Sequence, residues 1–146
     1  MASSKLVRFT LVALRIALGA IFVYAAWVKL RDPWQLFAMS IDAYRVLPLG
    51  MVELTARVVP WLELALGLWL IAGFWLRVSG ALVSLLLLTF FGLMVRAYAK
   101  GMAIDCGCFG PGEAISWKTL LRDGTLVAAA LLVTTMAFLN RPKTAA

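Results

Sequence analysis

The sequence predicts an all-α, polytopic membrane protein: a four-helix bundle with an interfacial amphipathic helix in its first long loop. Of its 146 residues, 64% are hydrophobic and 14% are charged, whereas soluble domains are roughly 45–50% apolar and about 25% charged. Lipid offers the backbone no hydrogen-bond partner, so each stretch of about 20 apolar residues is expected to cross the bilayer as an α-helix. The chain 1–146 is expected to be a single membrane domain whose crossings are 9–28, 58–76, 78–97 and 120–139.

The first crossing, 9–28, reads "FTLVALRIALGAIFVYAAWV". Its apolar run is longer than the 7–15 residues of a signal peptide and contains Arg15, which favours a membrane-spanning helix over a signal peptide that is cleaved off. Arg15 enters the span from the N-terminal side, so its side chain is expected to extend back to the headgroups at that side. Tyr24 and Lys29 lie near the other end of the same helix.

The connection 29–57 contains the predicted amphipathic helix, at about 33–46. Asp32 is suited to cap this helix and Pro33 to begin it. Its apolar residues fall three or four positions apart and form one stripe, made of Trp34, Phe37, Ile41 and Tyr44. We expect the helix to lie on the bilayer or to cap the bundle, in preference to docking a partner.

The remaining crossings are joined unequally. Helices 58–76 and 78–97 are separated by little more than Arg77, which predicts a tight antiparallel hairpin, whereas a second long connection precedes 120–139. Four crossings place both termini on one face of the membrane and both long connections on the other.

Glu63 lies inside the second crossing, in "PWLELALG". A carboxylate within a span is costly and usually faces the bundle interior with a partner. Two interpretations follow. In the functional interpretation, Glu63 is a proton relay or binds a membrane quinone together with Tyr24 and Lys29. Alternatively, it forms a structural hydrogen bond or ion pair that fixes helix packing. No cofactor other than a quinone is predicted.

The two cysteines, Cys106 and Cys108, lie in the glycine-rich connection "MAIDCGCFGPG". A disulfide between them requires a sharp bend, which Gly107 permits, and so small a ring is suited to exchange rather than to bracing. With Met102 the two thiols are also soft donors suited to Cu(I). A closed zinc site needs four ligands, and the chain has no histidine and no further cysteine. Structural or intermolecular thiols are the third alternative.

The formal net charge of +7 is typical of basic residues that flank membrane helices. The chain has no phosphate-binding "GK[ST]" loop and no basic repeat with interleaved aromatic residues, so nucleic acid is not an expected partner. The raw count of Lys and Arg favours an orientation with the long connections in the cytoplasm. The density of these residues favours the opposite orientation, with the termini in the cytoplasm. Charge therefore leaves the orientation open.

Five segments in order carry a family resemblance: "KLRDP" at 29–33, "YRVLP" at 44–48, "PWLELALGLWL" at 60–70, "DCGCFG" at 105–110 and "SWKTLLRD" at 116–123. With these, the chain resembles the bacterial MauE-type membrane proteins, which are more distantly related to the DoxX group. Ala26 departs from the pattern, where such proteins often carry glycine. The resemblance implies an integral membrane protein linked to disulfide formation or reduction in extracytoplasmic proteins, alongside a thioredoxin-like partner.

By this resemblance Cys106 and Cys108 are expected to exchange disulfides with a periplasmic or cell-surface thioredoxin-fold protein, as in a membrane thiol–disulfide oxidoreductase. Disulfides persist outside the cytoplasm, so the expected location is the bacterial inner membrane with the cysteine loop outside and the termini in the cytoplasm. Two alternatives remain: a non-catalytic assembly or scaffold subunit, and a Cu(I) carrier that uses Met102 with both cysteines.

Overall fold

The computed structural model describes residues 2–102, 104 and 114–139, of which 2–4 by their backbone alone. Within these residues the chain forms five helices, α1 (Ala2–Arg31), α2 (Trp34–Ala43), α3 (Leu49–Ala72), α4 (Leu76–Ala99) and α5 (Trp117–Leu139). All except α2 are long and apolar enough to cross a membrane. The predicted all-α membrane bundle is confirmed.

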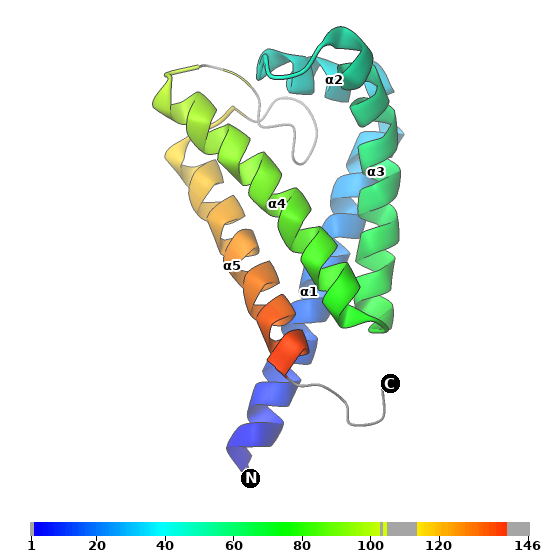
Figure 1. Ribbon diagram of the computed structural model, residues 1–146, viewed down its shortest axis with the longest axis vertical. Coiled ribbons are helices and arrows are strands. Elements are labelled where there is room, and N and C mark those ends of the chain that lie inside the picture. Colours follow the sequence, from blue (N-terminus) through cyan, green and yellow to red (C-terminus); the bar gives the residue numbers. More distant parts are fainter. Residues whose placement is uncertain (1, 103, 105–113, 140–146) are drawn as a thin grey trace.

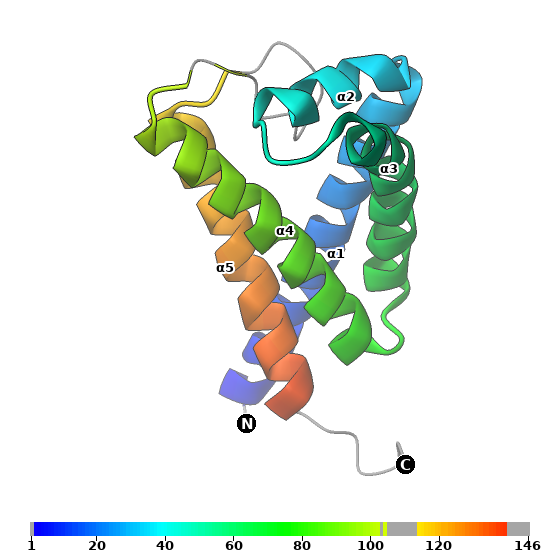
Figure 2. The ribbon, with the colours of Figure 1, turned by 45° about the horizontal axis from the view of Figure 1, so that its top comes forward.

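The four long helices form two closely packed pairs (Figure 1). α1 packs most extensively against α3, and α4 against α5, while α2 lies across one end of the bundle and packs mainly on α3. The start of α1, the α3–α4 turn and the end of α5 lie together at the opposite end, as Figure 2 also shows. Both ends of the α4–α5 connection are therefore on the same side of the bundle as α2.

α3 begins at Leu49, well before the expected start at 58. Its first turns carry Glu53 and Arg57, which form an exposed ion pair at 2.9 Å. Because these residues are charged, the sequence predicted a connection here rather than the start of the helix. Pro60 lies inside the helix without ending it.

The close approach of α1 to α3 depends on two glycines. A Cβ atom added at Gly19 would lie 2.7 Å from the Gly67 carbonyl oxygen, and one at Gly67 would lie 2.7 Å from the Gly19 carbonyl oxygen. Contacts this short are not tolerated by real side chains. Small residues at a membrane-helix crossing allow the two backbones to meet.

The turn between α3 and α4 is as tight as predicted and uses positive φ angles, but it lies at 73–75, and Arg77, where it was predicted, is inside α4. Gly73 ends α3 with a φ of 84°, and its N–H donates to the Trp69 carbonyl oxygen at 2.9 Å. Trp75 follows with a φ of 48°. The Arg15 guanidinium lies against Gly73, so Arg15 reaches toward the end of the bundle that holds the start of α1.

The apolar stripe of α2 packs onto the protein. Phe37 and Ile41 are buried in a cluster with Val52, Ala56 and Val59 of α3, with Trp34 beside it. Asp32 was expected to cap the helix and does not. Pro33 is the N-cap residue, and no side chain bonds to the helix start. Asp32 instead lies 3.7 Å from the Arg31 guanidinium.

Candidate functional site

Lys29 and Glu63 form an ion pair inside the bundle. Lys29 is in the last turn of α1 and Glu63 is one turn before Gly67 on α3, so the glycine crossing brings the two helices close enough for contact. The Lys29 ammonium donates to both carboxylate oxygens of Glu63, at 2.8 Å to Oε2 and 2.9 Å to Oε1. The two residues are 5% and 6% exposed. The structure thus joins two of the residues predicted from the sequence.

The Lys29 ammonium also lies over an aromatic ring from the helix that covers the bundle end. Its nitrogen is 5.1 Å from the centroid of the Phe37 ring on α2. A cation over the face of an aromatic ring is stabilised by the ring quadrupole. The ammonium is therefore held from α1, contacted by α2 and paired on α3.

Asp123 is a second buried acid at the same end of the bundle, and the sequence interpretation did not single it out. It lies in α5 and is 4% exposed. The neighbouring Arg122 guanidinium donates to it, with Nε 3.2 Å from Oδ1 and Nη2 3.4 Å from Oδ2. The signal was available, since an aspartate within a predicted crossing is as costly as Glu63.

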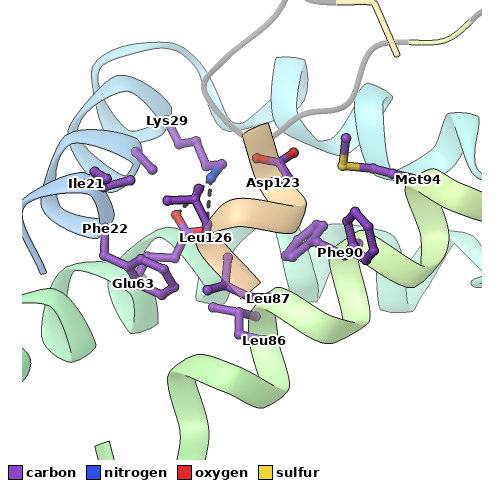
Figure 3. Close-up of a pocket in the computed structure, with 12 residues that line it drawn as sticks. Ile21, Phe22, Lys29, Glu63, Leu86, Leu87, Phe90, Met94, Asp123 and Leu126 are labelled. Carbon is purple, nitrogen blue, oxygen red and sulfur yellow. Dashed lines mark hydrogen bonds and ion pairs between the residues drawn. The ribbon is translucent and has the colours of Figure 1, made fainter. Parts of the chain in front are cut away.

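Lys29, Glu63 and Asp123 line one pocket (Figure 3). The pocket contains about 480 Å³ of empty space, part of it continuous with the outside. Lys29, Glu63 and Asp123 form its polar end, and the remaining walls are apolar. The apolar lining comes from α1, α4 and α5: Ile21, Phe22, Ala25, Leu86, Leu87, Phe90, Phe91, Met94 and Leu126.

Tyr24 does not line this pocket. It is 55% exposed, and its ring lies 6.4 Å from the Trp27 ring. Tyr24 and Lys29 are five residues apart, which separates them by about 140° around a helix of 3.6 residues per turn. Tyr24 therefore points away from the face of α1 on which Lys29 meets Glu63.

Cys106 and Cys108 lie outside the described residues, but the chain on either side of them is described. The Ile115 N–H donates to the Ile104 carbonyl oxygen at 2.9 Å, which ties the two ends of the connection together. Met102, Ile104 and Ile115 pack against a buried cluster that includes Met94, and Met94 lines the pocket. The connection therefore leaves and re-enters the bundle beside the pocket.

No group of three or more His, Cys, Asp or Glu side chains is arranged to hold a metal ion in the part of the chain that the structure describes. Met102, the third donor of the Cu(I) alternative, is half-buried against the cluster that contains Met94.

Fold and site together define a polytopic helical membrane protein with paired charges buried inside its bundle. The family model described as "Methylamine utilisation protein MauE" matches residues 7–136, and the chain belongs to the MauE family. The match includes all of α3 and α4 and most of α1 and α5.

Two curated relatives carry the same name, methylamine utilization protein MauE. The one from Paracoccus denitrificans is 34% identical over 126 residues, which cover 84% of this chain and 67% of the relative. The one from Methylorubrum extorquens is 31% identical over 109 residues, 73% of this chain and 58% of the relative. The chain thus spans about two thirds or less of the length of these relatives. No solved structure matches it.

Proposed function

We propose that this MauE-family protein is a membrane thiol–disulfide exchange protein. Cys106 and Cys108 are the reactive pair, and an extracytoplasmic thioredoxin-fold protein is the partner. The observation that carries the proposal is the convergence at one end of the bundle. There, the ends of the cysteine connection are tied together beside a pocket that holds two buried acids.

The exchange needs no external oxidant, because one disulfide is traded for another. A thiolate of the partner attacks one sulfur of the Cys106–Cys108 disulfide and forms a mixed disulfide. The second partner thiolate then attacks the mixed disulfide and releases the partner in its oxidised form. Two electrons pass to the cysteine pair, which becomes two thiols by taking up two protons. The reverse sequence oxidises the pair.

Glu63 is the proposed proton relay for these steps. It lies in the pocket beside which the connection begins and ends, and Lys29 holds its carboxylate in one position. A relay group must be fixed within hydrogen-bond reach of the proton route, directly or through a water molecule. The bidentate contact with Lys29 fixes the carboxylate at the polar end of the pocket.

The proposed location is the bacterial inner membrane, with the cysteine connection outside and both termini in the cytoplasm. The names of the two relatives refer to methylamine utilisation. We propose that this chain supports the maturation of an extracytoplasmic protein by disulfide exchange, since the exchange chemistry itself does not depend on which protein is the partner.

Trapping of the mixed disulfide in native membranes tests the proposal. Cys106→Ser and Cys108→Ser each leave one sulfur, and one of the two variants should accumulate a reductant-sensitive adduct with a thioredoxin-fold protein. The double variant Cys106→Ser/Cys108→Ser is the control and should form none. Absence of any adduct in both single variants, with thiols that stay alkylatable before and after reduction, would contradict the proposal.

The role of Glu63 has a separate test with a control on the same helix. Glu63→Gln should lower the rate of thiol oxidation or reduction at least tenfold, whereas Glu53→Gln, at an exposed position on α3, should leave it unchanged. A normal rate in folded Glu63→Gln would remove Glu63 from the mechanism and leave the cysteine pair untouched.

A further inference from the structure

We infer that the pocket between α1, α3, α4 and α5 binds the ring of a membrane quinone. The binding step stands on the described residues. The electron-transfer step rests on the proposed exchange function, for which the quinone would regenerate the disulfide.

The pocket has the two-part chemistry that an isoprenoid quinone requires. Its walls are apolar and include the aromatic rings of Phe22, Phe90 and Phe91, which suit a flat ring. Its polar end presents the Lys29 ammonium and the Glu63 and Asp123 carboxyl groups, as Figure 3 shows. A quinone ring has carbonyl oxygens that accept hydrogen bonds, and its tail is soluble in lipid.

Charge balance favours a neutral ligand over an ionic one. Lys29 is paired with Glu63, and Arg122 is hydrogen-bonded to Asp123, so the formal charges at the polar end cancel. An anionic lipid or fatty acid would meet two carboxylates, and a cation would meet the buried ammonium. Either would add an uncompensated charge to a site of low polarity, which is costly. A quinone adds none.

The redox step balances with this one co-reactant. The two thiols of Cys106 and Cys108 lose two protons and two electrons, and a sulfur–sulfur bond forms. The quinone takes up two electrons and two protons at its two oxygens and leaves as the quinol. Glu63 and Asp123 lie at the end of the pocket where those protons would pass.

Binding of ubiquinone-1 to the protein in phosphatidylcholine nanodiscs, measured against empty nanodiscs, tests the inference. Wild type and Cys106→Ser/Cys108→Ser should both bind one ubiquinone-1 per chain in a saturable manner. Leu87→Trp, which fills the pocket, should weaken binding at least tenfold. Leu88→Trp, its neighbour on an exposed face of α4, should bind as wild type does. Far-UV circular dichroism and thermal unfolding check that each variant is folded. Leu126→Phe is a second pocket-filling variant for the case that Leu87→Trp does not fold.

The outcomes separate the two proposals. No saturable binding to wild type, or equal affinity in wild type and in a folded pocket-filling variant, would overturn the quinone site. Saturable binding that Leu87→Trp abolishes, in a protein whose thiols never exchange with a thioredoxin-fold partner, would support the pocket and overturn the proposed function.

Discussion

The buried Lys29–Glu63 pair predicts a strong energetic coupling between α1 and α3. Lys29→Met leaves the Glu63 carboxylate without the ammonium that meets both its oxygens at 2.8 and 2.9 Å, and Glu63→Met leaves the ammonium without its carboxylate. Removing one partner of a buried pair costs about 3–5 kcal/mol, because the remaining charge stays desolvated. Replacing both partners with apolar side chains of similar volume is often neutral or stabilising. We therefore expect each single variant to be destabilised by about 3–5 kcal/mol and the double variant to recover at least half of one such loss.

The assay is reversible unfolding in mixed detergent and dodecyl sulfate micelles, followed by far-UV circular dichroism. The exposed ion pair of Arg57 with Glu53, on α3, is the matched control, since both side chains are more than half exposed. The double-mutant cycle of Arg57→Met and Glu53→Met should give a coupling of about 0.3–0.5 kcal/mol. Additive losses in Lys29→Met/Glu63→Met, or a coupling no larger than that of the exposed pair, would refute the reasoning.

Three further substitutions test the packing that positions the site. Gly67→Ala should lower the free energy of unfolding by about 1–3 kcal/mol, because its Cβ would meet the Gly19 carbonyl oxygen at 2.7 Å. The control Gly92→Ala, with open space around it, should raise it by roughly 0.5–1 kcal/mol. The same unfolding assay measures both variants, and equal effects would contradict the close crossing. Gly73→Ala should cost about 1–2 kcal/mol because its φ of 84° disfavours a side chain, and an unchanged midpoint would show that the turn does not need this conformation. Leu70→Ala, fully buried between helices, should cost about 2–5 kcal/mol, and Leu68→Ala, half exposed toward lipid, clearly less; a larger loss for Leu68→Ala would mean that α3 faces the other way.

The membrane fold was predictable from composition because lipid imposes one strong constraint. Every backbone polar group in the hydrocarbon must be satisfied within its own segment, so long apolar runs become helices. The tight α3–α4 hairpin and the amphipathic stripe of α2 followed from spacing in the same way, although the turn lies at 73–75 and Arg77, where it was predicted, is inside α4. The start of α3 did not, because Glu53 and Arg57 make its first turns polar while Val52 and Ala56 on the other face pack against α2.

The candidate site was predictable in part. Glu63 and Lys29 were selected because charges inside a span are costly, and the structure pairs them. Tyr24 was selected for its depth in the membrane, although its position around the helix points it away from the pocket. Asp123 was missed although the same cost argument applies to it. The roles of Cys106 and Cys108 stay predictions.

The amino-acid order by itself determined which segments enter the bilayer and at which depth each charge lies, since both depend on local hydropathy and on a rise of about 1.5 Å per residue. The tertiary structure decided which charges meet. Lys29 and Glu63 are 34 positions apart, and Asp123 is on a third helix. Whether their side chains share one pocket depends on how each helix is rotated and how closely it packs. That rotation is set by contacts such as the Gly19–Gly67 crossing, which join distant parts of the chain and leave no local pattern in either one.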